Sequence, residues 1–434
     1  MNNINVYGAG LAGSEAAWQA AHHGAHVTLY EMKPRKKSPA HHSDTFAELV
    51  CSNSLRSAEF TNGAGLLKEE LRRMDSLIME AAYASRVSAG GALAVDRNIF
   101  SEYVTEKIRS CPNIEVVEEE MTDIPADEIT VVATGPLTSD ALAAKIAELI
   151  GGKSLYFYDA AAPIVDFESV DMTKAFFASR YDKGTPDYIN CPFSREEYDA
   201  FWNALTTAEE APVHGFEDSK VFEGCMPIEV NARRGYDTLR FGILKPIGLP
   251  DPKTGKDPYA VLQLRRDNAN GTLYNLVGCQ THLKFGEQKR VFSMITALRN
   301  AEFVRYGVMH RNTFLDSPRL LDATYALKSE PRIRFAGQMT GVEGYIESTA
   351  SGWVAGVATA MDVLGKPMPT LDRLTATGAL ATYISDHTVT KFQPMNINFG
   401  IIEPLGYKIK GKREKNAKIS ERALERIESL KGEL

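Results

Sequence analysis

The stretch Ile4-Asn5-Val6-Tyr7-Gly8-Ala9-Gly10-Leu11-Ala12-Gly13 decides the fold. A short β-prone run leads into the pattern G-x-G-x-x-G, an Ala-rich helix is predicted over residues 14–23, and residues 25–30 return to a β-prone run. In such a loop the first glycine allows a tight turn, the second lets backbone amides approach a pyrophosphate, and the third lets the helix pack closely on the sheet. The order strand, turn, helix, strand therefore predicts the first unit of a Rossmann-type dinucleotide-binding domain.

An acidic residue stands at the end of the second predicted strand. Glu31 follows Gly13 by 18 residues, at the place where a carboxylate can accept hydrogen bonds from ribose hydroxyls. The helix that follows the glycine loop directs about half a positive charge toward the phosphates. We therefore predict that the nucleotide site contains Gly8, Ala9, Gly10, Leu11, Ala12, Gly13 and Glu31.

The rest of the chain divides into three segments by its pattern. In residues 1–150, predicted helices at 65–84 and 99–108 are followed by β-prone runs at 114–117 and 129–133, which indicates a mostly parallel sheet. Residues 151–300 are rich in aromatics and prolines with short, mixed strands, and we expect an inserted mixed α+β domain. The α/β pattern resumes at residues 332–337 and ends in an amphipathic helix. The predicted fold class is α/β, with a Rossmann-type FAD-binding domain built from residues 1–150 and 301–434 around the inserted domain.

Two later segments favour FAD over NAD as the bound dinucleotide. Residues 131–135, ending in Thr134 and Gly135, resemble the strand end that passes near the adenine half of FAD in flavoproteins with two dinucleotide domains. Residues 333–337, followed by a helix of small residues, resemble the late flavin-binding segment of the same proteins. An acidic residue usually follows Gly337 in those proteins, whereas this chain has Gln338. Thr134, Gly135, Gly337 and Gln338 are therefore predicted FAD contacts, with the contact made by Gln338 left open.

The composition is that of an ordinary globular protein. A chain of 434 residues with 44% apolar and 24% charged residues can form two or three domains with a sizeable core, which argues against a disordered chain or a coiled coil. The longest charge-free apolar stretch, residues 348–361, is shorter than the roughly 18–20 residues of a membrane helix. Five cysteines without regular spacing favour a reducing compartment. We therefore expect a cytoplasmic protein without a membrane segment.

The net charge of −7 conceals a basic C-terminal segment. Residues 407–434 hold nine Lys and Arg against five Glu. Such a patch can bind a phosphate backbone even on an acidic protein, although it also fits a solvated helix start. The candidate phosphate contacts are Arg233, Arg234, Arg240, Lys245 and the run Lys408, Lys410, Lys412, Arg413, Lys415 and Lys418.

Two cysteines lie in predicted loops at the ends of apolar elements. A disulfide reductase is unlikely because Cys51 has no neighbouring cysteine. Arg56 or a nearby helix N-terminus could lower the pKa of the Cys51 thiol, and Cys225 is the second candidate. From local sequence alone, a cysteine of this kind is more often a packed apolar residue. Cys111, Cys191 and Cys279 are interpreted as structural. His41 and His42 precede Cys51, but no Cys/His spacing fits zinc, and we predict no metal.

Several long motifs point to one family. They are the loop at residues 8–13 and residues 48–56, 89–97, 158–163, 223–229, 305–314 and 337–345. From about Asn5 to the C-terminal helix, the chain resembles the bacterial FAD- and folate-dependent methylenetetrahydrofolate–tRNA (uracil-5-)-methyltransferases, the TrmFO family.

The resemblance implies an activity and site residues. The family forms 5-methyluridine in the T loop of tRNA, with 5,10-methylenetetrahydrofolate as carbon donor and FAD, reduced by NADPH or NADH, as reductant. The positions that match its two cysteines are Cys225, the expected nucleophile at uracil C6, and Cys51, which helps to remove the C5 proton. Tyr345 matches a position beside the flavin ring. The inserted domain of residues 151–300 is then expected to bind the substrate or RNA. His310, Arg311 and Asn312 could donate to carbonyls of folate or uracil.

Other readings of the sequence stay open at this point. The larger flavin- and folate-dependent enzyme of wobble uridines shares the flavin domain, but this chain lacks its long C-terminal helical region. The same chemistry on a ribosomal RNA uridine is an alternative, as is a non-catalytic, FAD-containing RNA-binding protein. The sequence does not determine the oligomeric state, and a monomer is one of the possibilities.

Overall fold

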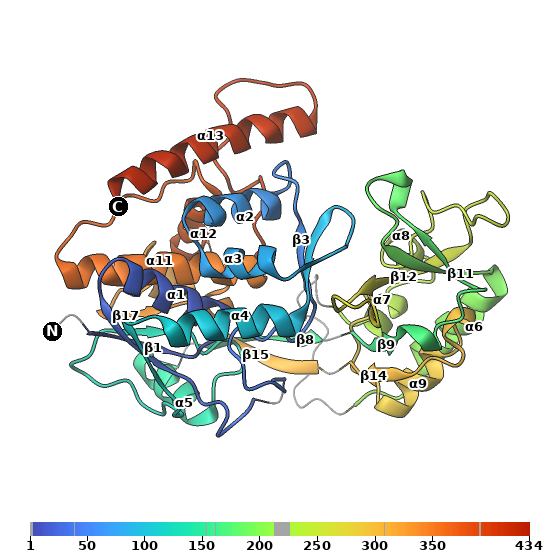
Figure 1. Ribbon diagram of the computed structural model, residues 1–434, viewed down its shortest axis with the longest axis horizontal. Helices are drawn as coiled ribbons and strands as arrows, with labels where there is room; N and C mark the ends of the chain where they lie inside the picture. The colour runs from blue at the N-terminus through green and yellow to red at the C-terminus, as the bar shows by residue number, and fades with distance from the viewer. Residues whose placement is uncertain are drawn as a thin grey trace.

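The computed structural model describes residues 3–38, 40–152, 154–160, 162–211, 226–307, 309–389 and 392–434, with the backbone alone for residues 154–160 and 309–313. Two lobes lie side by side in Figure 1. The left lobe is formed by the N-terminal and C-terminal parts of the chain, and the right lobe by its middle part. The domain limits at residues 150 and 300 stay a prediction.

The left lobe is built on a six-stranded sheet of order β16-β17-β7-β1-β2-β6. Its strands are β1 (Asn3–Tyr7), β2 (His26–Tyr30), β6 (Ile114–Val117), β7 (Thr130–Val132), β16 (Ala326–Leu327) and β17 (Glu330–Phe335). The pairs from β17 to β6 are parallel, and β16 is an antiparallel edge. Tyr7 stands opposite both Tyr30 and Val132. The carboxyl ends of these strands therefore meet at one edge, where ligands of open α/β sheets bind.

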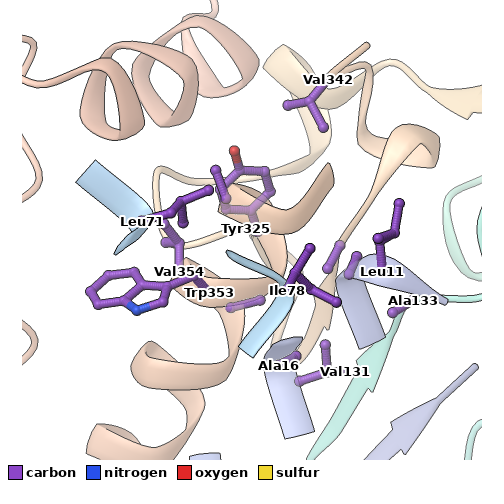
Figure 2. Close-up of a cluster of buried hydrophobic side chains, with 14 of the residues drawn as sticks. Leu11, Ala16, Leu71, Ile78, Val131, Ala133, Tyr325, Val342, Trp353 and Val354 are labelled. Atoms are coloured by element: carbon purple, nitrogen blue, oxygen red, sulfur yellow. The ribbon is translucent and has the colours of Figure 1, made fainter. Parts of the chain in front are cut away.

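Helices pack around this sheet and complete the predicted α/β fold. They are α1 (Leu11–His22), α2 (Gly63–Arg73), α3 (Leu77–Ala84), α4 (Arg97–Ser110), α5 (Asp140–Leu149), α10 (Ser317–Leu320), α11 (Tyr345–Leu364), α12 (Ala376–Ser385) and α13 (Lys412–Glu433), with a 3₁₀ turn at Gln338–Thr340. Side chains from α1, α2, α3, α11 and β7 form part of one continuous core (Figure 2). The fold class predicted from the sequence is confirmed.

Two glycines let α11 lie directly on α1. A Cβ atom added at Gly352 would stand 2.2 Å from the carbonyl oxygen of Ala12, and one added at Gly356 would stand 2.4 Å from that of Ala16. Residues 348–361, the longest apolar stretch of the sequence, form most of α11 and are buried in this core. Among the described residues, no helix is long and apolar enough to span a membrane.

The single helix predicted over residues 65–84 is wrong, because the chain breaks between α2 and α3. Asp75 has a positive φ of 55° there. The Ser76 side chain accepts a hydrogen bond from the Met79 N–H (3.2 Å) and caps α3. Buried Glu15 accepts from the Ser76 hydroxyl (2.7 Å) and the Ile78 N–H (3.1 Å). A new helix therefore starts at its own cap, Ser76, which contacts Glu15 of α1, and the local periodicity does not contain this contact.

The right lobe contains a second sheet with antiparallel pairs, of order β10-β11-β12-β13-β9-β14. The strands are β9 (Ile164–Asp166), β10 (Phe176–Ala178), β11 (Tyr188–Phe193), β12 (Ala260–Arg266), β13 (Leu273–Leu276) and β14 (Phe303–Arg305). Its helices are α6 (Arg195–Thr207), α7 (Ile228–Arg233), α8 (Thr238–Phe241) and α9 (Phe285–Phe292), with 3₁₀ turns at Phe167–Ser169, Arg180–Asp182 and Thr296–Leu298. A hydrophobic core of its own runs from Val165 to Ala301.

Two small sheets lie where the lobes meet (Figure 1). One pairs β8 (Ser154–Ala160) with β15 (Met309–Leu315), and the other joins β3 (Ser54–Ser57), β4 (Arg86–Val87) and β5 (Ala92–Val95). The backbone of Gly90, beyond β4, donates to the Asp187 carboxylate of the right lobe at 2.8 Å. The segment that carries Cys51 runs directly into β3, and so it approaches the meeting point of the lobes.

Candidate functional site

An elongated cleft of about 1160 Å³, including its open mouth, lies at the carboxyl ends of β1, β2, β7 and β17. It brings together segments that are hundreds of residues apart in the chain. Ten of the predicted cofactor-binding residues line it: Gly8, Gly10, Leu11, Ala12, Glu31, Thr134, Gly135, Gly337, Gln338 and Tyr345. The other two, Ala9 and Gly13, are buried behind its wall.

The glycine loop has the shape that a bound pyrophosphate needs. Gly8 has a φ of +91°, and a Cβ there would stand 2.8 Å from the Ala133 carbonyl oxygen. A Cβ at Gly13 would stand 1.8 Å from the Gly8 carbonyl oxygen, so this residue must be glycine for α1 to approach the loop. A Cβ at Gly10 would meet no atom within 4 Å, so the backbone is open there. The three glycines therefore serve the turn, the helix contact and the ligand approach that their spacing predicts.

Helix α1 points its N-terminus into this loop. No side chain of the described residues caps it, and its first turn contains no acidic residue. The first intrahelical hydrogen bond is donated by the Ser14 N–H to the Gly10 carbonyl at 2.9 Å. The earlier N–H groups at Leu11 and Ala12 lie in the wall of the cleft, where an anion can accept from them. The residues present here fit the diphosphate of a dinucleotide.

Glu31 is fixed by backbone groups at the other side of the loop. Its two carboxylate oxygens accept from the N–H groups of Ala9 (2.7 Å) and Lys33 (3.0 Å). Each oxygen retains a lone pair, and the residue lines the cleft, as a ribose contact requires. The Ala9 N–H is therefore taken by Glu31 within the described structure.

Lys33 and His41 also line the cleft, and no sequence pattern selects Lys33 for it. The Lys33 ammonium group donates to the Thr45 carbonyl, and burial lowers the pKa of this lysine. Burial likewise lowers the pKa of His41, whose Nδ1 lies 2.6 Å from the Ser38 hydroxyl. Groups of three or more metal-binding side chains are absent from the described part of the chain.

Tyr345 connects the cleft to the Cys51 segment. Its hydroxyl oxygen accepts from the backbone N–H groups of Cys51 (2.8 Å) and Ser52 (3.2 Å). Burial and the proximity of Cys51 raise the pKa of Tyr345 well above its usual value. Because Tyr345 and Val50, the residue before Cys51, both line the cleft, Cys51 is held beside it. The two residues were predicted separately, and the structure brings them together.

Arg56, the residue expected to act on the Cys51 thiol, has an acidic partner. Its guanidinium group forms an ion pair with Glu347, a fully buried residue of the first turn of α11. The Glu347 carboxylate also accepts from the Ile397 N–H at 3.0 Å. A different arginine, Arg97, donates to the Leu49 carbonyl at 2.5 Å and to Asp267 at 3.0 Å. Arg97 therefore contacts the Cys51 segment, although the sequence offered no reason to select it as a site residue.

The second predicted cysteine, Cys225, lies outside the described residues. The residues on either side of residues 212–225 contact one stretch of the right lobe: the Ala211 N–H donates to the His282 carbonyl and the Ile228 N–H to the Gln280 carbonyl, both at 2.8 Å. Side chains at His310, Arg311 and Asn312 are also outside the description. The backbone places these three opposite Asp159, Tyr158 and Phe157 in the strand pair between the lobes.

The predicted phosphate contacts differ in how many of them already contact other side chains of the protein. Arg233 pairs with Glu210, and the Arg240 guanidinium lies 3.7 Å from the centre of the Tyr259 ring and 2.5 Å from Asp237. Lys408, Lys410, Lys412, Arg413 and Lys415 are exposed at the start of α13. Arg413 approaches Glu59 only at 3.9 Å. The C-terminal run is thus the more accessible of the two basic groups.

A Rossmann-type sheet with a glycine-lined cleft at its carboxyl edge defines this chain as a dinucleotide-binding protein. The family model described as "Glucose inhibited division protein A" matches residues 3–367. The chain is 62% identical over 421 residues to a methylenetetrahydrofolate–tRNA-(uracil-5-)-methyltransferase TrmFO of Acetivibrio thermocellus, with 97% of each chain covered. A relative of the same name from Listeria monocytogenes is 58% identical, with 100% of this chain and 99% of the relative covered. The chain therefore belongs to the TrmFO family.

Solved structures agree on the fold. GidA of Aquifex aeolicus, in its form II crystal, superposes with a TM-score of 0.72 at 16% identity. The match covers 99% of this chain and 73% of that chain. The larger GidA protein therefore shares the architecture of both lobes.

Proposed function

We propose that the protein is a tRNA (uracil-5-)-methyltransferase that uses FAD and 5,10-methylenetetrahydrofolate to form 5-methyluridine in the T loop. The observation that supports this most directly is the position of Cys51 beside a dinucleotide cleft, in a chain so similar over its length to enzymes of that name. We found no specific observation in favour of a ribosomal RNA substrate or of a non-catalytic role.

The residues of the cleft have distinct roles in this proposal. The N–H groups at Gly10, Leu11 and Ala12 hold the diphosphate of FAD, and Glu31 accepts from ribose hydroxyls. Tyr345 lines the cleft, and in this proposal its ring lies beside the flavin while its hydroxyl holds the Cys51 backbone. Gln338 donates to Glu343 at 2.8 Å, which orients its amide at the position that is acidic in other flavoproteins.

The chemistry requires two thiols because C5 of uracil is a poor nucleophile. We assign to Cys225 the addition to C6, which turns the ring into an enolate whose C5 bonds to the methylene carbon of the folate. Cys51 removes the C5 proton as tetrahydrofolate leaves, and an exocyclic methylene remains on the ring. When bound, reduced FAD supplies the hydride that turns this methylene into a methyl group. The Cys225 thiolate then leaves C6, which restores the aromatic ring.

The RNA has to reach the cleft and expose its base. We propose that Lys408, Lys410, Lys412 and Arg413 bind the phosphate backbone, and that the enzyme turns the target uridine out of its stack. His310, Arg311 and Asn312 are proposed contacts to carbonyls of folate or uracil. We further propose NADPH or NADH as the source of reducing equivalents. The cytoplasmic location stays a prediction, and the oligomeric state stays open.

The test is a methylation assay on an unmodified tRNA transcript with labelled methylenetetrahydrofolate, followed by mapping of the labelled base. We expect label at the T-loop uridine, its loss in Cys51→Ala and Cys225→Ala, and its retention in the control Cys111→Ala. Label on another base would refute the substrate, and full activity in both site variants would refute the mechanism.

A further inference from the structure

The Cys51 segment is held from both lobes, and the contact from the right lobe is a buried arginine. Arg265 lies on β12, where it stands opposite Tyr188 of β11 and Asn275 of β13, so the sheet fixes its position. Only 9% of its surface is exposed. Its side chain leaves the right lobe and contacts the two residues that follow Cys51.

The geometry of this contact is specific. The Arg265 Nη2 atom donates to the Ser52 hydroxyl at 2.6 Å, and its Nε donates to the Asn53 side-chain oxygen at 3.2 Å. The Asn53 amide then donates to the carbonyl of Val95 (3.0 Å) and to that of Arg266 (2.9 Å). Ser52 and Asn53 are thus connected to strands of both lobes.

The opposite side of the same segment is held by the cleft. The Tyr345 hydroxyl accepts from the N–H groups of Cys51 and Ser52, so Ser52 is bonded through its backbone to the left lobe and through its side chain to the right lobe. A guanidinium group suits this role because its planar N–H groups reach two acceptors at once. Burial lowers the pKa of Arg265, and Tyr188 and Asp267 act in the opposite direction.

We propose that Arg265 is a positioning residue, which transmits the position of the right lobe to Cys51 by holding Ser52 and Asn53 in place. This inference rests on the proposed function for its effect on catalysis, but not for its effect on the accessibility of Cys51. Loss of the contact leaves FAD binding intact, because Arg265 does not line the cleft.

The experiment compares Arg265→Gln with the control Arg266→Gln in the full-length protein. Arg266 is the next residue of β12, and its guanidinium group lies against Gly271 instead of the Cys51 segment. We expect kcat for tRNA methylation to fall about tenfold or more in Arg265→Gln, since a shift of about 1 Å at a reacting group can cost about a hundredfold. The FAD content, the KM for tRNA and the control variant should stay unchanged.

A second measurement does not depend on methylation. Iodoacetamide labelling, mapped by mass spectrometry, gives the alkylation rate of half-buried Cys51 relative to half-buried Cys111 in the same protein. We expect this ratio to rise several-fold in Arg265→Gln and, to a smaller extent, in Ser52→Ala, with no further rise in the double variant. Wild-type kcat and an unchanged labelling ratio would overturn the proposal, and so would equal changes in Arg266→Gln. A wild-type protein without methylation activity would instead contradict the proposed function, and the labelling ratio would still test Arg265.

Discussion

The contact between α1 and α11 offers a sharp test of how the cleft is built. In Gly352→Ala the new methyl group would stand 2.2 Å from the Ala12 carbonyl oxygen and 2.8 Å from its Cα. An ordinary contact needs at least about 3.4 Å, so the helices must separate by about 1 Å. Overpacking of this kind costs about 1–3 kcal/mol.

The same shift moves two walls of the cleft apart. Helix α1 contributes Leu11 and Ala12 at its N-terminus, and α11 contributes Tyr345 and Ser348 in its first turn. If the helices relax in the apoprotein and about half of the packing cost, about 0.5–1.5 kcal/mol, returns when FAD binds, FAD affinity falls about two- to tenfold, because 1.4 kcal/mol corresponds to a factor of ten.

The assay is titration of the apoprotein with FAD, together with thermal unfolding. Gly286→Ala is the matched control, since a Cβ at this residue of α9 would meet no atom within 4 Å. We expect weaker FAD binding and a lower Tm in Gly352→Ala and neither change in the control. A Gly352→Ala protein that binds FAD and unfolds like the wild type would refute this account of the helix contact.

Three further predictions concern side chains in different parts of the molecule. Tyr345→Phe keeps the ring but removes the acceptor of two N–H groups, which destabilises the Cys51 loop by about 1 kcal/mol. We therefore expect near-normal FAD content, faster alkylation of Cys51 and about tenfold slower methylation. Unchanged methylation would contradict this prediction, and Tyr383→Phe is the control. Burial raises the pKa of Glu70 from its ordinary value of 4.5 to about 7. Between these two values the folded state binds more protons than the unfolded state. The contribution of Glu70 to stability is therefore complete below about pH 4.5 and is lost as the pH rises through 7. We expect the free energy of unfolding by urea to differ less between about pH 5 and about pH 8 in Glu70→Gln than in the wild type. Equal differences in the two proteins would contradict this prediction. Combined Lys408→Glu, Lys410→Glu and Lys412→Glu should weaken tRNA binding and flatten its salt dependence without loss of FAD, whereas unchanged affinity would remove this patch from the interface.

The sequence predicts the dinucleotide cleft well because its signals are local. Gly8, Gly10 and Gly13 have roles that follow from their spacing on one strand–turn–helix unit, and Glu31 ends the neighbouring parallel strand. Thr134 and Gly337 follow β7 and β17, which pair with each other in the same sheet. Strand order alone brings these ends to one edge, so the residues converge on the cleft as expected.

Contacts between distant segments could not be predicted in this way. The break at Asp75 depends on Glu15 of another helix, and the buried position of Lys33 depends on the carbonyl of Thr45. The link from Arg265 to Ser52 joins residues 213 positions apart, in different lobes. Such hydrogen bonds between distant residues produce no periodic pattern in the sequence. Cys225, which the family resemblance selected, lies outside the described residues, and its approach to Cys51 stays a prediction.

The stoichiometry of a single turnover tests the central claim most directly. Protein with pre-reduced flavin is mixed anaerobically with methylenetetrahydrofolate and unmodified tRNA, and flavin oxidation is followed by absorbance while methyl groups in the RNA are counted. The account predicts one flavin oxidised for each 5-methyluridine formed. Methyl groups that appear without flavin oxidation, or flavin oxidation that leaves the RNA unchanged, would contradict it.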